Sequence, residues 1–170
     1  MLRTLKQILR TGIISESRIS HQDDSGPVSK LQAQLHRRFG RALAVRHVDA
    51  GSCNGCELEI HAVTNPYYNL EGYGIRFVAS PRHADVLLVT GPVSRHMETA
   101  LKQAYDAMPD PKWVIAVGNC ACTGGLFGLG YASCGPVARV LPVDQVVSGC
   151  PPPPDAILHA LVAVVTTSHK

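Results

Sequence analysis

The sequence predicts an α/β domain: an open, mostly parallel sheet with helices on both faces. From Lys30 onward, short runs of β-branched residues alternate with helical patterns. The strand candidates are apolar along their length, as expected of strands that are covered on both sides. The chain has 170 residues with 45% hydrophobic content, enough for one compact domain with its own core.

The first half of this pattern begins with a helix and a strand. Helices are expected at 30–39 and 56–63, and strands at 43–48, 75–79 and 85–90. The second half continues with a helix at 94–107 and a strand at 113–117. A Gly-rich stretch at 124–135 follows, and then a strand at 143–147 and a helix at 155–166. The order of strands and helices predicts a flavodoxin-like arrangement, with residues 30–170 as one domain.

Residues 1–29 differ in character from the rest of the chain. Leu2, Leu5, Ile8 and Leu9 share one helical face, and a polar segment around Gly26-Pro27 follows. We interpret this part as a docking arm, and a disordered tail is the alternative. A basic amphipathic helix can lie on a membrane surface or on a partner protein, and the sequence alone does not separate the two.

Composition narrows the classes of function. A net charge of +3 without a Lys/Arg stripe argues against nucleic-acid binding. No apolar run is long enough to span a bilayer, and no secretory or twin-arginine signal is found, so a cytoplasmic location is expected. Six cysteines in such a chain favour metal binding over disulfides.

Four cysteines stand in three turns that follow predicted strands. Cys53 and Cys56 form a close pair, whereas Cys120 and Cys150 stand alone after a glycine-containing turn. Because the carboxyl ends of parallel strands meet at one sheet edge, the fold can gather all four thiolates into one iron–sulfur site. Structural zinc is the alternative, although it is usually held by two close pairs. Cys122 is a less favoured substitute for Cys120.

The remaining candidates are weaker. Cys134 fits a buried structural cysteine, and no nucleotide-binding glycine motif is found. The eight histidines are scattered without metal-ligand spacing. Glu57 and Glu59 follow Cys56 directly, where carboxylates usually only decorate the first turn of a helix.

Four motifs carry a resemblance to a known family. They are Cys53–Ile60 (CNGCELEI), Ser80–Leu87 (SPRHADVL), Gly118–Gly125 (GNCACTGG) and the segment from Pro142 to Pro152 that contains GCPP. In this order they resemble the small subunit of membrane-bound, energy-converting (group 4, formate hydrogenlyase type) [NiFe] hydrogenases. The homologous iron–sulfur protein of respiratory complex I, its B subunit, is similar as well. The similarity covers roughly residues 40 to 165.

The resemblance implies one [4Fe–4S] cluster, ligated by Cys53, Cys56, Cys120 and Cys150, close to the active site of a large subunit. Two residues separate Cys53 from Cys56, as in hydrogenase small subunits, whereas complex I subunits have adjacent cysteines there. Glu59 matches the family's acidic position, so a proton-relay role for Glu59 is a hypothesis.

The resemblance also implies partners. We expect a hydrogenase large subunit with a NiFe site, a ferredoxin-like iron–sulfur subunit and membrane subunits, with this chain as a peripheral, non-catalytic redox subunit on the cytoplasmic side of the inner membrane. The alternatives are the B subunit of a complex I-like NADH-quinone oxidoreductase, which passes electrons to quinone, and a non-redox zinc scaffold.

Overall fold

The computed structural model describes residues 2–11, 33, 37 and 40–167 of the chain. The expected helix at 30–39 therefore lies almost entirely outside the described residues. The helix α1 (Leu2–Thr11) agrees with the amphipathic pattern of the N-terminal arm, and its Leu2 and Leu9 are exposed.

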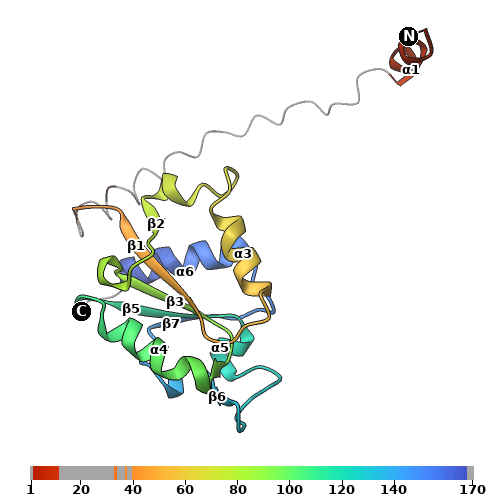
Figure 1. The fold of residues 1–170 in the computed structure, drawn as a ribbon. Coiled ribbons are helices and arrows are strands. Elements are labelled where there is room, and N and C mark those ends of the chain that lie inside the picture. Colours follow the sequence, from red (N-terminus) through yellow and green to blue (C-terminus); the bar gives the residue numbers. More distant parts are fainter. Residues whose placement is uncertain (1, 12–32, 34–36, 38–39, 168–170) are drawn as a thin grey trace.

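A five-stranded sheet forms the centre of the domain (Figure 1). Its strands are β1 (Leu43–Asp49), β2 (Ile75–Phe77), β3 (Val86–Thr90), β5 (Trp113–Val117) and β7 (Gln145–Val147). They lie in the order β2-β1-β3-β5-β7, and every neighbouring pair is parallel. This is the flavodoxin-like strand order, and it confirms the predicted fold class.

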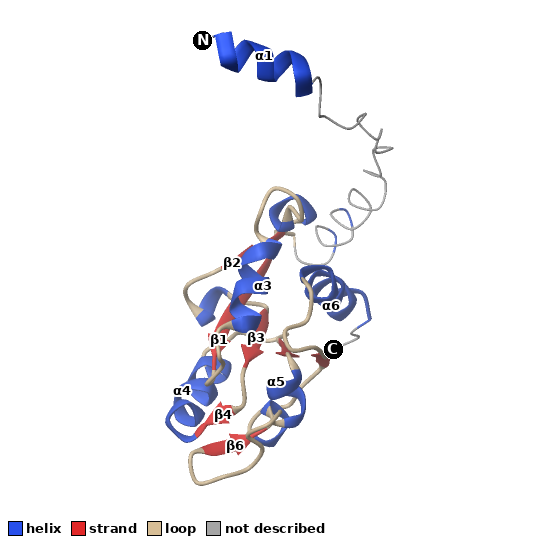
Figure 2. Ribbon diagram, turned by 90° about the vertical axis from the view of Figure 1, so that its right-hand side faces the viewer, coloured by secondary structure: helices blue, strands red, loops and turns tan. Residues whose placement is uncertain are grey.

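Helices cover both faces of the sheet (Figures 1 and 2). They are α3 (Gly55–Val63), α4 (Arg95–Asp106), α5 (Asn119–Thr123) and α6 (Pro154–Thr167). Short 3₁₀ turns also occur at η1 (Leu70–Tyr73), η2 (Pro81–His83) and η3 (Val137–Arg139). Both faces are therefore closed to water, which explains why β3 and β5 are buried at every position.

The alternation of side chains along the strands creates two cores. On β3, Val86 and Leu88 join the core beneath α3 and α6, whereas Leu87 and Val89 join the core beneath α4. Trp113 is fully buried in the first core and Leu101 of α4 in the second. Side chains therefore pack against both faces of the sheet, and this packing fixes the strand ends at which the loops begin.

Several expected boundaries shift in the structure. The strand predicted at 75–79 ends at Phe77, and the one predicted at 143–147 begins at Gln145. Ser94 caps the helix α4, since its hydroxyl accepts a hydrogen bond from the Met97 N–H at 3.3 Å.

Besides the 3₁₀ turns, two strands and one α-helix of the described residues were not predicted. The strands β4 (Val93–Ser94) and β6 (Ser133–Gly135) pair as a small antiparallel sheet, and β6 lies inside the stretch expected only to be Gly-rich. The single-turn helix α5 immediately follows β5. Within the described residues, no helix is long and apolar enough to cross a membrane.

Candidate iron–sulfur site

The first cysteine turn leaves β1 at the carboxyl edge of the sheet. The Asp49 carboxylate accepts hydrogen bonds from the N–H groups of Gly51 and Ser52, at 2.8 and 2.7 Å. Asn54 then adopts a left-handed conformation with φ 72°, and α3 begins at Gly55. This geometry places exposed Cys53 just before the helix and half-buried Cys56 in its first turn.

Glu57 links this turn to the sheet beneath it. Its side chain is buried, and the Ser52 hydroxyl donates a hydrogen bond to its Oε2. The other carboxylate oxygen lies 3.7 Å from Nε2 of His47 on β1, and that ring nitrogen is 3.0 Å from the Thr90 hydroxyl. The interpretation of Glu57 as a decoration of the helix surface is therefore wrong: Glu57 is buried, it ties α3 to Ser52 in the preceding turn, and its Oε1 has no hydrogen-bond partner among the described residues.

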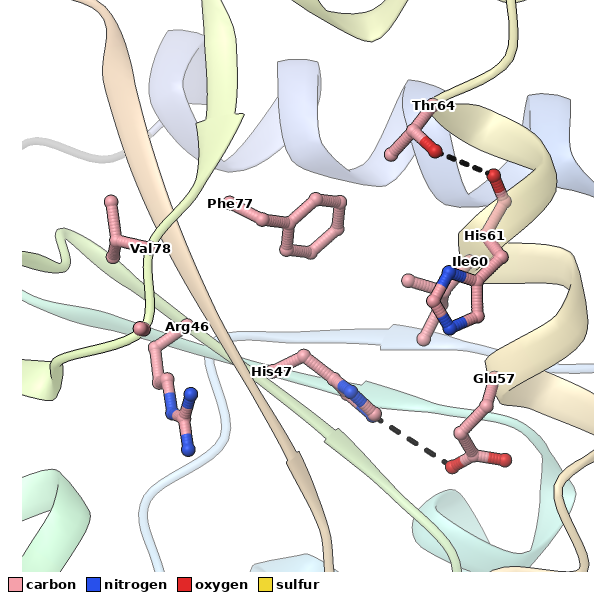
Figure 3. A pocket seen from close by; sticks show the side chains of 9 residues that line it. Arg46, His47, Glu57, Ile60, His61, Thr64, Phe77 and Val78 are labelled. Atoms are coloured by element: carbon pink, nitrogen blue, oxygen red, sulfur yellow. Dashed lines mark hydrogen bonds and ion pairs between the residues drawn. The ribbon is translucent and has the colours of Figure 1, made fainter.

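A cavity of about 390 Å³ opens beside Glu57, between α3 and the β1–β2 edge (Figure 3). His47 and Glu57 lie next to each other in its lining, and Ile60, His61 and Phe77 contribute to its walls. Burial lowers the pKa of His47, although the nearby Glu57 carboxylate opposes that shift. None of the cysteines lines this cavity, so the thiol chemistry belongs to the sheet edge rather than to the cavity.

The second and third turns are fastened to each other. The Asn119 N–H donates to the Gly149 carbonyl at 2.8 Å, and the Gly149 N–H donates to Oδ1 of Asn119 at 2.9 Å. The Gly118 N–H also donates to the Val147 carbonyl at 2.8 Å. Cys120, which follows Asn119, and Cys150, which follows Gly149, are consequently held as neighbours.

Two glycines leave space for the thiol groups because they have no β-carbon. A β-carbon on Gly118, whose φ is +87°, would lie 2.5 Å from Cys56 Sγ. A β-carbon on Gly125 would lie 2.7 Å from Cys120 Sγ. Any side chain at these positions would displace a thiol, so the backbone forms a cradle around the sulfur atoms.

The electrostatics show that the four cysteines lie close enough to influence one another. Burial raises the pKa of Cys56 to about 12, and Glu57, Cys53, Cys120 and Cys150 each add to the rise. Burial also raises the pKa of Cys120, with further contributions from Cys150 and Cys53. The raised pKa values of Cys56 and Cys120 suit a cationic centre, because a bound metal stabilises the thiolate form.

Cys122 and Cys134 point elsewhere. Cys122 Sγ donates to the carbonyls of Ala116 and Val147 at 3.5 and 3.6 Å, and it packs against the core beneath α4, whereas Cys56 packs against the opposite core. Cys134 is buried and donates to Glu98 at 3.2 Å. The choice of Cys120 over Cys122 and a structural role for Cys134 stay predictions.

In the described part of the chain, no three His, Cys, Asp or Glu side chains converge tightly enough for a single metal ion. A tetrahedral zinc ion holds each sulfur about 2.3 Å from one point. An iron–sulfur cluster occupies more room, and each of its thiolates binds a different iron.

Comparison with known proteins places the chain in a family. A family model described as "NADH ubiquinone oxidoreductase, 20 Kd subunit" matches residues 53–164, which include all four cysteines. The chain belongs to the NADH ubiquinone oxidoreductase 20 Kd subunit family.

Relatives within the 20 Kd subunit family come from several complexes. The chain is 48% identical over 135 residues to the "Probable membrane-bound hydrogenase subunit mbhJ" of Pyrococcus furiosus, covering 79% of this chain and 81% of that protein. It is 42% identical over 132 residues to "Formate hydrogenlyase subunit 7" of Escherichia coli, covering 78% of this chain and 52% of that protein. It is also 42% identical over 146 residues to the B subunit of the NADH-quinone oxidoreductase of Desulfovibrio desulfuricans, covering 85% of this chain and 75% of that protein.

A solved structure shares the 20 Kd subunit fold. It is a chain of "the membrane-bound sulfane sulfur reductase (MBS), an archaeal respiratory membrane complex", with a TM-score of 0.66 and 28% identity, covering 82% of this chain and 78% of that one. The predicted family resemblance is thereby confirmed, and the likeness includes the fold as well as the sequence.

Proposed function

We propose that this chain is the electron-transfer subunit of a membrane-bound hydrogenase complex of the formate hydrogenlyase type. In this proposal Cys53, Cys56, Cys120 and Cys150 hold one [4Fe–4S] cluster. The observation that carries the proposal is the convergence of these four thiols, from three separate strand ends, on one glycine-lined edge of the sheet. The similarity to a hydrogenase subunit and to a formate hydrogenlyase subunit supports the choice of complex.

The bound cluster would supply one-electron transfer. The residues of this chain supply the ligands and their placement. Asn119 and Gly149 fasten two ligand turns together, and the hydrogen bond from the Ser52 hydroxyl to Glu57 closes the third turn onto α3. Two glycines, at positions 118 and 125, keep side chains away from the sulfur atoms. Fixed ligands and a partly buried setting are the means by which a protein tunes the potential of such a centre.

The proposed partners follow from this role. Electrons pass between a large subunit that holds the NiFe site and a ferredoxin-like iron–sulfur subunit, and membrane subunits anchor the assembly. The chain itself is a peripheral subunit on the cytoplasmic side of the membrane, and it carries out no bond-making chemistry. Relatives named for membrane complexes support its membership of such a complex.

A second candidate is a quinone-reducing, complex I-like assembly. The 42% identity to an NADH-quinone oxidoreductase protein favours it. The two residues between Cys53 and Cys56 favour the hydrogenase branch instead, since complex I subunits resemble this chain but have adjacent cysteines. The adjoining large subunit decides the question: two CxxC pairs there would provide nickel ligands, and their absence would favour the quinone assembly.

A matched pair of variants tests the ligand set. The complex is purified anaerobically with Cys120→Ser or Cys122→Ser, and iron, acid-labile sulfide and the EPR signal of the reduced cluster are measured. We expect Cys120→Ser to lose the cluster signal and Cys122→Ser to retain it. A normal signal in Cys120→Ser would refute the assignment. One zinc ion per chain, without iron or visible absorbance, would show that the chain is a zinc scaffold and holds no cluster.

A further inference from the structure

The helix α1 arranges its residues in parallel rows. Residues three and four positions apart lie on the same face of an α-helix, so each row runs along the helix axis. The apolar row is Leu2, Leu5 and Leu9, the cationic row is Arg3, Lys6 and Arg10, and the neutral row is Thr4, Gln7 and Thr11. A shift of one residue turns a row by about 100° around the helix, so the cationic row borders the apolar row along the whole of α1. Ile8, the remaining residue, lies on the other side of the apolar row.

The apolar row is open in the structure. Leu2 is 82% exposed and Leu9 is 81% exposed, so no described part of the chain covers them. A helix of 10 residues is marginal in water by itself, because most of the stability of a short amphipathic helix comes from covering its apolar face. A surface that covers this row would therefore stabilise α1.

The formal net charge of the chain resides in the segment that contains α1. Residues 1–15 hold three basic residues, which are those of the cationic row, and no Asp or Glu. The whole chain has 16 Lys and Arg and 13 Asp and Glu, so residues 16–170 contain 13 of each sign and have no formal net charge. All three side chains of the cationic row are exposed. The covering surface must therefore accept apolar side chains and a row of cations side by side.

An anionic lipid surface meets both requirements. Its acyl chains cover an apolar helix face, and its phosphate groups attract Lys and Arg, whose long side chains reach from the border of that face to the headgroups. The apolar centre of a protein interface is depleted in Lys, and a row of cations on a protein partner needs matching carboxylates. The border position of the cationic row therefore favours lipid over protein.

We propose that α1 binds an anionic lipid surface and lies in its plane. The apolar row enters the acyl region, the cationic row contacts the lipid phosphates, and the neutral row faces water. Residues 12–42 join α1 to β1, and a chain of this length extends to at most about 100 Å, so α1 can reach a bilayer that the domain itself does not touch. The inference does not depend on the cluster or on the identity of the complex.

Vesicle binding tests the charge requirement. The full-length chain is mixed with sedimenting vesicles of phosphatidylcholine, either pure or as a 7:3 mixture with phosphatidylglycerol, and the bound fraction is measured. The test variant, Arg3→Gln/Lys6→Gln/Arg10→Gln, removes the cationic row. We expect it to bind the anionic vesicles about tenfold more weakly than the wild type, or weaker still, because each basic residue near an anionic surface adds to the affinity. Wild-type binding should also fall when the salt concentration rises from 0.1 to 0.5 M.

A matched control removes the same charge from the domain. Arg76, Arg82 and Arg139 are exposed there, and their combined replacement by Gln gives the same formal net charge as the test variant. We expect this control to bind anionic vesicles as the wild type does. Equal losses in the two triple variants would show a general effect of charge and overturn the inference.

A pair of tryptophan variants tests the orientation of the helix. The one tryptophan of the wild type, Trp113, is fully buried in the domain, so its emission serves as a constant background. In Leu9→Trp, on the apolar row, we expect the emission to shift to shorter wavelength when anionic vesicles are added. Gln7→Trp, on the neutral row, should show no shift. A shift in both variants, or in neither, would contradict the orientation and overturn the inference.

Three further outcomes overturn the inference. The first is a wild-type chain that binds neither kind of vesicle, or a test variant that binds as tightly as the wild type. The second is a complex that loses one subunit in the test variant but keeps it in the domain control, since α1 would then dock on that protein. The third is a concentration-dependent dimer of the purified chain that disappears in the test variant, which would assign the helix to a second copy.

Discussion

Asn119 and Gly149 bind each other through a reciprocal pair of hydrogen bonds, one in each direction, at 2.8 and 2.9 Å. They lie 30 positions apart in the sequence, and each immediately precedes a proposed cluster ligand. The pair therefore sets the spacing between Cys120 and Cys150 before any metal binds.

The first prediction concerns this pair. Asn119→Ala removes the acceptor for the Gly149 N–H, which is expected to lower the free energy of unfolding by about 1 kcal/mol. The cluster should also be lost faster when an iron chelator is added, because the Cys150 turn is no longer fastened. Asn65→Ala is the control, since the Asn65 side chain likewise accepts backbone hydrogen bonds but in a turn remote from the cysteines. Equal rates of iron loss in the two variants would contradict the role of Asn119.

The second prediction concerns Gly118. In Gly118→Ala the new methyl group would meet Cys56 Sγ, so cluster content should fall by more than half. Gly128→Ala is a close match, because Gly128 also has a positive φ, of +53°, but has nothing within 4 Å of its absent β-carbon. Gly128→Ala should lose about 1 kcal/mol of stability from backbone strain and keep its cluster. Iron and sulfide per chain measure the difference, and full content in Gly118→Ala would show that the thiol can move aside.

The third prediction concerns pH. Burial lowers the pKa of His47 in the folded state, so on acidification the unfolded chain takes up the proton first. His47 therefore stabilises the fold above pH 6.5 relative to lower pH, and this contribution is lost as the pH falls below that value. In urea unfolding between pH 7 and pH 5, His47→Gln should lose less stability than the wild type. His159→Gln, at an exposed position on α6, should follow the wild type. If the free energy of unfolding changes with pH by the same slope in His47→Gln and in the wild type, the prediction is contradicted.

The fourth prediction concerns the attachment of β3. Asp85 is buried and accepts hydrogen bonds from both terminal nitrogens of Arg41, at 3.1 and 2.7 Å, and from the Ala44 N–H at 2.9 Å. Asp85→Asn should lower the free energy of unfolding by about 2 kcal/mol, because hydrogen bonds to a charged group are lost in a partly buried setting. Asp110→Asn should change stability by less than about 0.5 kcal/mol, since the side chain of Asp110 is largely exposed. The measurement is the denaturant concentration at the midpoint of unfolding at pH 7. Similar losses of stability in the two variants would contradict the prediction.

The fifth prediction concerns Glu59, which is half-buried on α3 and two residues beyond buried Glu57. If Glu59 relays protons, Glu59→Gln should reduce hydrogen turnover by the complex severalfold. The pH profile of that turnover should also change, with cluster content unchanged. Glu71→Gln, at an exposed position, serves as the control. A rate and pH profile equal to the wild type in Glu59→Gln would remove the hypothesis.

The central strands could be read from the sequence because their residues are almost entirely apolar. Trp113 to Val117 was predicted at its observed bounds, and the run that ends at Thr90 was predicted within one residue. The positions of the cysteines after these strands then followed from the common direction of parallel strands. Local composition and chain direction were sufficient for these parts of the molecule.

The missed features depend on contacts between distant residues. The helix α5 is one turn long and is held by the bonds of Asn119 to the β7 turn, which no local periodicity reveals. The burial of Glu57 depends on Ser52 and His47, which come from a turn and a strand. In the Gly-rich stretch at 124–135, the glycine spacing does not reveal which of the intervening side chains are exposed, and the structure shows that Leu126, Phe127, Leu129 and Tyr131 are.

The cysteine turns follow three different strands, and this arrangement has a consequence for the biogenesis of the protein. Cys150 emerges from the ribosome long after Cys53 and Cys56, and the turns meet only when β7 has joined the sheet. The complete set of four thiols therefore exists only after the sheet has formed as far as β7, its last strand. The Asn119–Gly149 pair then joins the Cys150 turn to the Cys120 turn, so assembly of the site is the last step in forming the sheet edge.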